Sequence, residues 1–414
     1  MSSSFRSVTP LGALGWVTIT HVMFACSAIA QEVAFVPQAN ISTEWATNRN
    51  LTIPAGPDSE LYRTTVGADL LRRTSVSDLD FRPLITMQHD AQISTLDTLE
   101  ALVDLAGDYR TLRSESSLLA EYRREDAYNS QYGITVFNPL NPYAPDTAGT
   151  GAIATGITRT TYQLAPQFAY DFEQRLSITG SADLIAVRYS TDVPGELVSY
   201  NSPTVDLALG WRLNPASRIA VGPYYSYYNP TNNTEGAVKT TTYGVSFDFI
   251  TRTSSVSNSR ITARVERDSS PAAYGAPSFN QTLWGLEWVG LHKFLTSNIQ
   301  YSIGRFLEPG SAGGRTTSDE LRVQYSRFLT QRCSVNAAVR LTRNSDVGNS
   351  VINDSNNRDR ANALAGVSYL FTPEWSVSAG YRYSRLKYAG ASEGANSNAV
   401  FLTLGYHGLQ PPRD

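Results

Sequence analysis

Apolar and polar residues alternate along this chain in stretches of about 10–14 residues, from about residue 60 to residue 407. The pattern is clearest in residues 242–249 (TYGVSFDF), 334–341 (SVNAAVRL) and 375–384 (WSVSAGYRYS). Successive side chains of a β-strand point to opposite faces, so each stretch predicts a strand with one apolar and one polar face. Long polar-inside, apolar-outside strands are typical of membrane barrels.

The breaks between these stretches come in two sizes that take turns along the chain. The short breaks are residues 171–174, 213–216, 295–297, 329–331 and 371–374, where Pro, Asn, Ser and Thr favour tight turns. The long, polar breaks are residues 192–202, 229–238, 269–280, 345–359 and 390–398. Short turns at one end and long loops at the other indicate an outer-membrane barrel whose short turns face the periplasm.

The breaks predict about 18 strands in an all-β, transmembrane, antiparallel up-and-down barrel, with 16 strands as the alternative count. The predicted strands are residues 38–47, 60–71, 80–90, 97–107, 113–125, 157–170, 175–189, 203–213, 217–229, 239–252, 259–268, 281–293, 298–308, 318–329, 332–344, 360–371, 375–388 and 398–408. A soluble β-sandwich or propeller also alternates, but its turn lengths need not take turns in this way. Aromatic residues near many strand ends favour the membrane barrel, since they suit its interfacial girdles.

The first 30 residues predict a cleaved signal peptide, so that residues 31–414 form a single barrel domain. Arg6 precedes a mostly apolar stretch, and residues 28–30 (AIA) form a small-x-small cleavage site. The alternatives are a membrane anchor, which Thr18, Thr20 and His21 interrupt, and lipidation of Cys26. After cleavage Cys333 is the one cysteine left, which excludes an intramolecular disulfide. The strands use nearly all of residues 31–414, which leaves no room for a plug domain.

If Val335, Val377 and Phe247 face lipid, most charged strand residues fall on the inner face. A charge at the lipid midplane costs about 2–4 kcal/mol, so inward placement is expected. These residues either pair across strands and stiffen the wall, or line a water-filled path for a polar solute. Both signs are present, so a neutral or weakly charged solute fits better than an acidic polymer. The predicted inner-wall residues are Arg63, Asp69, Arg82, Asp104, Glu121, Arg123, Arg212, Arg264, Glu266, Glu287, Glu320, Arg322, Arg340 and Arg382.

The longest break, residues 126–156, is the third external loop by this count. It is long enough to fold into the lumen, where Asn138, Asn141 and Tyr143 would narrow the path. The alternative is an ordinary surface loop rich in Pro and Gly.

Catalytic, cofactor, metal and nucleic-acid sites are not predicted. Of the three histidines that survive cleavage, His89 and His292 fall on the outward register or near strand ends, without an evident Ser or Asp partner. The chain has no G-x-S-x-G, H-E-x-x-H or phosphate-cradling motif, and residues 353–359 lack calcium-loop spacing. A formal net charge of -3 does not suggest a nucleic-acid-binding protein.

The C-terminal hairpin carries a family resemblance. Residues 371–383 (FTPEWSVSAGYRY) and 398–406 (NAVFLTLGY) resemble the C-terminal end of an outer-membrane β-barrel porin family (type 2) that is associated with exopolysaccharide export loci. The resemblance implies an outer-membrane porin that passes polar solutes or polysaccharide, with periplasmic polysaccharide-export components as partners. Many barrels end on an aromatic residue, whereas this chain continues from Tyr406 to residues 411–414 (PPRD). The alternative is a non-conducting structural or adhesion barrel that acts through its external loops.

Overall fold

The computed structural model describes residues 32–127, 156–192, 197–231, 239–254, 257–270, 278–309, 315–346 and 357–409. These residues form 18 strands and one short 3₁₀ turn, η1 (Ser94–Leu96). The strands are β1 (Glu32–Ala46), β2 (Ser59–Arg73), β3 (Ser77–Asp90), β4 (Thr98–Arg110), β5 (Ser114–Asp126), β6 (Thr158–Asp171), β7 (Leu176–Tyr189), β8 (Tyr200–Asn214), β9 (Ser217–Pro230), β10 (Thr240–Ser254), β11 (Ser257–Ser270), β12 (Phe279–Lys293), β13 (Ser297–Pro309), β14 (Arg315–Phe328), β15 (Cys333–Asp346), β16 (Arg358–Leu370), β17 (Trp375–Tyr388) and β18 (Ala395–His407).

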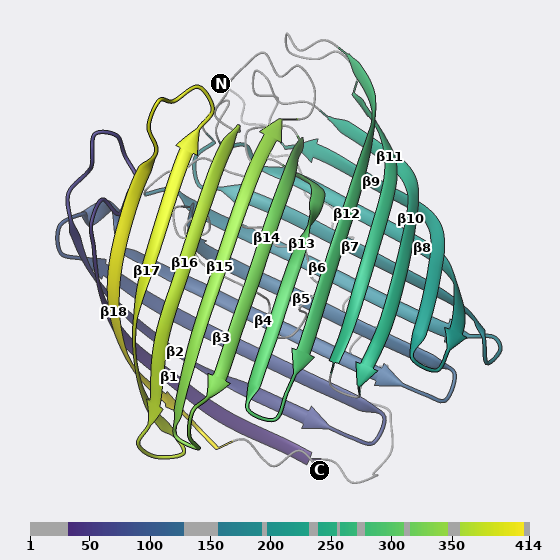
Figure 1. Ribbon diagram of the computed structural model, residues 1–414, viewed down its shortest axis with the longest axis horizontal. Helices are drawn as coiled ribbons and strands as arrows, with labels where there is room; N and C mark the ends of the chain where they lie inside the picture. The colour runs from purple at the N-terminus through teal and green to yellow at the C-terminus, as the bar shows by residue number, and fades with distance from the viewer. Residues whose placement is uncertain are drawn as a thin grey trace, which may run out of the picture.

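The strands close into a single antiparallel barrel (Figure 1). Each strand pairs with its neighbours in the chain, and β1 pairs with β18 through a register that places Ile41 opposite Leu404. Closure leaves no strand edge unpaired, as lipid requires. The predicted fold class and the count of 18 strands are confirmed, and the alternative count of 16 is wrong.

Each predicted strand overlaps one observed strand, and the largest shift is at the start of β1. The prediction begins at residue 38, whereas β1 begins at Glu32 and pairs there with Arg73 of β2. Residues 33–37 (VAFVP) are almost uniformly apolar and contain a proline, so the alternation that marks the other strands is absent there. Pairing with β2, rather than local pattern, extends the strand.

The connections confirm the two alternating lengths. At one end of the barrel, successive strands are separated by two to four residues, and at the other end by five to 31 residues. We call these the short-turn end and the long-loop end. β1 begins and β18 ends at the short-turn end. The segment between β5 and β6 is the third connection at the long-loop end, as predicted.

The two faces of the wall differ in the way the alternation predicts. Val245 and Val265 are 54% and 61% exposed on the outer face, whereas the neighbouring Ser246 is 1% exposed. Exposed apolar side chains recur on the outer face of nearly every strand, and buried polar side chains lie on the inner face. An outer apolar surface of this kind is stable in lipid and not in water. Among the described residues, no helix is both long and apolar enough to cross a bilayer.

Candidate functional site: the inner wall of the barrel

The strand register decides which side chains face the interior. Directly paired residues of neighbouring strands point to the same face. Val245 of β10 pairs with Val265 of β11, which pairs with Trp284 of β12, and all three are exposed on the outer face. The residues between them therefore face inward. Extending this register around the closed barrel assigns the regularly paired strand positions to one face each.

This register places each of the predicted inner-wall residues at an inward position. The set is Arg63, Asp69, Arg82, Asp104, Glu121, Arg123, Arg212, Arg264, Glu266, Glu287, Glu320, Arg322, Arg340 and Arg382. That these residues contact a solute remains a proposal, to which we return below.

Inward charges are segregated around the barrel, a feature that sequence reasoning missed. Strands β3–β8, which we call the acidic wall, carry more carboxylates than arginines. Their inward arginines are Arg82, Arg110, Arg123, Arg159 and Arg212. Their inward carboxylates are Asp78, Asp80, Asp90, Glu100, Asp104, Asp108, Glu115, Glu121, Glu125, Asp171, Asp183 and Asp206.

The opposite imbalance occurs on β14–β17, which we call the basic wall. Among the inward side chains that the structure describes there, Glu320 is the one carboxylate. The inward arginines are Arg322, Arg340, Arg358, Arg360 and Arg382. In an 18-stranded barrel, strands nine apart in the order lie across the lumen, so β14–β17 face β5–β8. Figure 1 shows β14–β17 at the front and β3–β7 behind them. The interior therefore has a positive side and a negative side.

On the basic wall, Glu320 is enclosed by two arginines. Its carboxylate accepts a hydrogen bond from Arg322 and lies 2.7 Å from Nη2 and 2.9 Å from Nε of Arg340. All three side chains are buried. Such charge-assisted hydrogen bonds are about twice as strong as neutral ones, and they compensate the cost of burying the three charges.

A second inward cluster joins the first strand to the end of the chain. Glu44 of β1 accepts from Arg382 of β17, and Arg49 Nη1 lies 2.6 Å from the same carboxylate oxygen. Arg49 also lies 3.6 Å from Asp90 of β3. These contacts connect both sides of the β1–β18 seam at the long-loop end, so side-chain ion pairs reinforce the closure of the barrel.

On the acidic wall, like charges are placed side by side. Asp104 of β4 lies directly opposite Glu121 of β5, an arrangement that is destabilising unless cations lie near. Arg123 Nε is 3.1 Å from Glu121, and Arg82, which is paired in register with Asp104, lies 2.8 Å from Asp69. Two arginines therefore stabilise this acidic group from its edges.

Between the two walls, oppositely charged side chains are paired. Asp248 of β10 accepts two hydrogen bonds of 3.0 Å from Arg260 of β11 and one of 2.5 Å from Thr262. Arg264 lies over the ring of Tyr224, 4.7 Å from its centroid, a cation–π contact. The wall-stiffening interpretation of the inner charges is thus realised on β9–β11.

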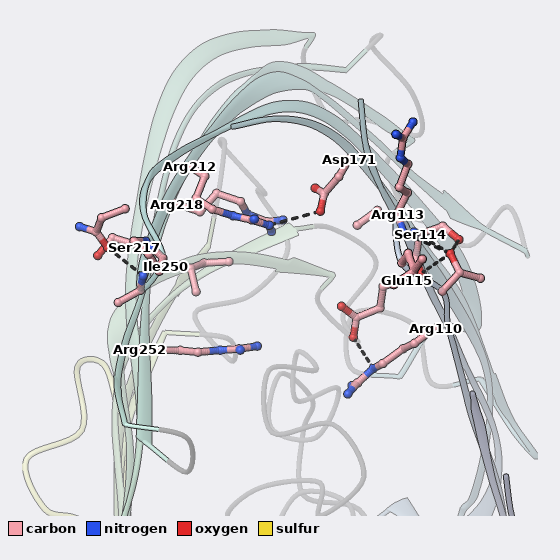
Figure 2. Close-up of a pocket in the computed structure, with 16 residues that line it drawn as sticks. Arg110, Arg113, Ser114, Glu115, Asp171, Arg212, Ser217, Arg218, Ile250 and Arg252 are labelled. Atoms are coloured by element: carbon pink, nitrogen blue, oxygen red, sulfur yellow. Dashed lines mark hydrogen bonds and ion pairs between the residues drawn. The ribbon is translucent and has the colours of Figure 1, made fainter. Parts of the chain in front are cut away.

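At the short-turn end, five arginines surround a cavity of about 340 Å³ inside the barrel (Figure 2). Arg110 lies 3.0 Å from Glu115, and Arg212 lies 3.2 Å from Asp171. Neither Arg218 nor Arg252 forms an ion pair with the part of the chain that the structure describes. The fifth is Arg113, in the turn between β4 and β5. Sequence reasoning found Arg212 alone, because the others come from turns and strand ends of distant segments.

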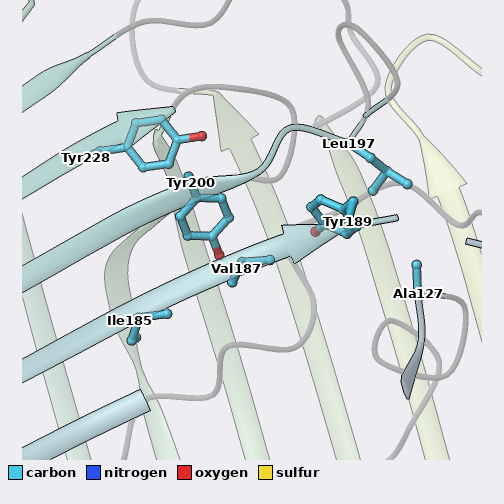
Figure 3. Close-up of a cluster of buried hydrophobic side chains, with 7 residues drawn as sticks. All are labelled: Ala127, Ile185, Val187, Tyr189, Leu197, Tyr200 and Tyr228. Carbon is cyan, nitrogen blue, oxygen red and sulfur yellow. The ribbon is translucent and has the colours of Figure 1, made fainter. Parts of the chain in front are cut away.

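At the long-loop end, the inner face of β7–β9 is apolar instead of charged. Tyr200 and Tyr228 pack with ring centroids 5.2 Å apart, and Val187 and Tyr189 of β7 lie beside them (Figure 3). Leu197 and Ala127 complete the cluster from outside the strands β7–β9. These apolar residues lie at inward positions, where the alternation predicts polar side chains. The sequence pattern therefore did not reveal the cluster.

The predicted constriction residues Asn138, Asn141 and Tyr143 lie outside the described residues, as does the signal peptide. The ends of that loop are defined: the main-chain N–H of Ala127 donates to Ile157 at 2.7 Å, and Gly156 N–H donates to Asp126 at 3.2 Å. The two strands therefore meet as a hairpin base at the lip of the barrel.

Both histidines that the sequence placed outward do lie on the outer face, but the prediction that neither has a Ser or Asp partner is wrong. His89 Nδ1 lies 3.0 Å from Asp97, and His292 Nε2 lies 3.5 Å from Ser259 Oγ. The partners come from a neighbouring loop and strand, which sequence spacing does not reveal. Asp97 also accepts from the main-chain N–H of Asp90 at 2.8 Å, which lowers the pKa of its carboxyl.

Within the described ranges, no group of three His, Cys, Asp or Glu residues is arranged to hold a metal ion.

The chain matches no protein-family model and no curated protein. The solved structures to which it is similar include three from Pseudomonas aeruginosa: OccK5 (OpdH), OpdK with vanillate, and OccK2 (OpdF) in complex with glucuronate. The identities are 9%, 9% and 8%, and the TM-scores are 0.41, 0.43 and 0.44. Each alignment covers 91% of this chain and 98%, 98% and 99% of the other chain, respectively.

Proposed function

We propose that this protein is a porin-like barrel of the bacterial outer membrane, through which polar solutes pass without an energy source. The observation that carries the proposal is the inner wall: a closed, apolar-faced barrel carries charged side chains inside, with carboxylates in excess on one side and arginines in excess on the opposite side. A structural barrel needs only ion pairs within its wall. Charge separated across the lumen instead creates a transverse field, which acts on whatever lies between the walls.

The solute class follows from that field. A small molecule with its own dipole, or with separated positive and negative groups, gains favourable contacts with both walls at once. A polyanion gains on the basic wall but is repelled by the more numerous carboxylates of β3–β8. We therefore extend the neutral or weakly charged solute of the sequence analysis to dipolar and zwitterionic solutes.

The finer assignment, passage of an exopolysaccharide together with periplasmic export components, is supported by the resemblance of the C-terminal hairpin alone. Neutral oligosaccharides that enter the lumen would block ion current in a length-dependent way, whereas their failure to block would remove that assignment and leave the general one.

We also propose that residues 1–30 are a signal peptide cleaved after Ala30. The predicted site lies directly before β1, which begins at Glu32. N-terminal sequencing of barrel purified from outer membranes should read Gln31 first. Recovery of an intact Met1 in folded, membrane-inserted protein would contradict the cleavage.

Single-channel recording in planar bilayers tests the proposed conduit. The full barrel should give a small conductance, and a variant lacking residues 128–155 should give a larger one, because we propose that this loop narrows the path. The variant should still fold, because the hairpin base at Ala127 and Ile157 can close without that loop. A variant lacking residues 348–355, from another long connection, serves as control and should conduct like the full chain.

Absence of conductance in both the full barrel and the loop-deleted barrel would contradict the conduit. It would favour the alternative of a non-conducting adhesion barrel that acts through its loops.

A further inference from the structure

The outer face of β13–β17 carries a concentration of charge that a lipid-facing wall does not need. Six outward charged side chains gather there, towards the long-loop end, on five neighbouring strands. We call them the outer charge cluster: Arg305, Asp319, Arg343, Asp359, Arg385 and Lys387. Charged side chains are costly at the midplane of the bilayer, so a cluster of this size is expected near the headgroup region.

The cluster contains four cationic side chains but two carboxylates, and each carboxylate pairs with one arginine. Arg305 donates two hydrogen bonds of 2.5 and 2.6 Å to Asp319, and Arg343 Nε lies 2.8 Å from Asp359. Arg385 and Lys387 flank Asp359, yet neither forms a hydrogen bond or ion pair with any side chain in the described ranges. The cluster therefore presents an excess of two positive charges at its β17 edge.

A groove joins these cations to an apolar floor. It has a volume of about 920 Å³ and is lined by all six members of the cluster. The next outward residues that pair across these strands, one step closer to the short-turn end, are Trp288, Ile303, Leu321 and Leu341. On β17 the same row of paired residues ends at Arg385. Trp288, Ile303 and Leu341 are each 44% exposed. One groove therefore offers cations above and apolar side chains below.

The level of the cluster suits the headgroup region of the bilayer. Strands of 13 to 15 residues rise about 45–50 Å, and a tilt of about 40° reduces this to roughly 35 Å across the membrane. The apolar band of a barrel is about 25 Å tall, so about 10 Å of strand, divided between the two ends, lies beyond it. The cluster lies within four residues of the long-loop ends of β13–β17, next to that margin.

We propose that the groove binds a phosphorylated lipid of the outer leaflet, with the phosphate on Arg385 and Lys387 and an acyl chain along Trp288, Ile303, Leu321 and Leu341. Charge complementarity favours this occupant: guanidinium and ammonium groups bind phosphate, and the floor is apolar where an acyl chain would lie. The proposal rests on the outer-membrane barrel under Proposed function and on the orientation that the sequence predicts, with the short turns in the periplasm and the long-loop end outside, but not on conduction through the lumen.

Binding of lipid A to the purified full barrel in detergent tests the proposal. The barrel should bind diphosphorylated lipid A more tightly than lipid A whose phosphates have been removed. The double variant Arg385→Gln with Lys387→Gln should bind the phosphorylated form at least about tenfold more weakly and the dephosphorylated form unchanged. Inorganic phosphate at matched concentration should not displace the lipid, because it lacks contacts with the floor.

Two controls separate this site from general surface charge. Arg124 is an outward arginine at the same end on β5, across the barrel, and Arg327 is outward at the short-turn end of β14. Arg124→Gln and Arg327→Gln should bind lipid A as the unaltered barrel does. Equal loss in Arg124→Gln, or unchanged affinity in the double variant, would overturn the proposal.

Other outcomes of the same experiment also count against the lipid. Displacement by inorganic phosphate would make the groove a free-phosphate site. A dimer that dissociates in the double variant, without change in lipid binding, would assign the groove to a second copy of the chain. Because the variants lie on the outer face, their single-channel conductance should match that of the unaltered barrel, so failure of lipid binding is distinguishable from failure of the conduit. If the double variant does not fold, Lys387→Gln alone should show a smaller loss of the same kind.

Discussion

Glu320→Gln should reduce the free energy of unfolding of the barrel by about 3–5 kcal/mol. The substitution keeps the volume of the side chain but removes the charge that Arg322 and Arg340 share, and both arginines are buried. Two guanidinium groups would then lie side by side on the inner wall without their shared carboxylate. Urea unfolding of the barrel in lipid vesicles, followed by tryptophan fluorescence, measures the loss.

A matched control is available at the short-turn end. Glu115 pairs with Arg110 at 3.0 Å, but both side chains are more than half exposed, so Glu115→Gln should cost at most about 1 kcal/mol. Adding Arg340→Gln to Glu320→Gln should recover part of the stability, because it removes one of the two like charges that had shared the Glu320 carboxylate. A loss below about 1 kcal/mol in Glu320→Gln would mean that water reaches these arginines and solvates them.

Replacing carboxylates of the acidic wall should shift the ion selectivity of the pore towards anions. The variant combines Asp104→Asn, Asp183→Asn and Asp206→Asn, all at inward positions. One unit charge at about 4 Å in water is worth about 1 kcal/mol, or about fivefold in a permeability ratio. At pH 9, where all three carboxylates carry their charge, three such changes, reduced by salt screening, should alter the anion-to-cation ratio by about tenfold. The reversal potential across a salt gradient measures this ratio.

The basic wall supplies a test of opposite sign. Arg358→Gln with Arg360→Gln should shift the reversal potential towards cations, since it removes two positive charges from the facing wall. Asp359→Asn is the control, because Asp359 lies between these arginines in sequence but points to the outer face. It should leave the selectivity unchanged. Shifts of the same sign in both inner-wall variants would contradict the placement of these side chains along the conducting path.

Much of the fold was predictable because its strongest signals are local. Residues 242–249 alternate strictly, and so the side-chain period of two assigned them to a strand and to its two faces. The same reasoning failed at residues 33–37, where the chain is apolar on both faces and the strand is held by pairing with β2. Inward placement of Arg340 and Glu320 followed from parity, because a charge against lipid is costly.

The sequence predicted which residues of each strand face inward, but not which inward residues of different strands lie together. Parity found Arg212 as an inner-wall residue, but not that Arg110 and Arg252 surround the same cavity. It found Arg382, but not that this residue binds Glu44 across 338 positions of sequence. The aromatic pair of Tyr200 and Tyr228 was missed altogether, because both are inward residues of the apolar type that the pattern assigns to lipid.

By itself, the sequence determined the strands, their two faces and the alternating turn lengths, because each depends on residues within about a dozen positions of one another. Only the tertiary structure decided which strands face each other across the lumen. That relation depends on the pairing of β1 with β18, which closes the barrel at 18 strands and sets β7 opposite β16. Charges that look mixed along the chain, such as Asp183 and Arg360, are thereby sorted onto opposing walls, and the field that we propose to act on the solute exists only once the barrel is closed.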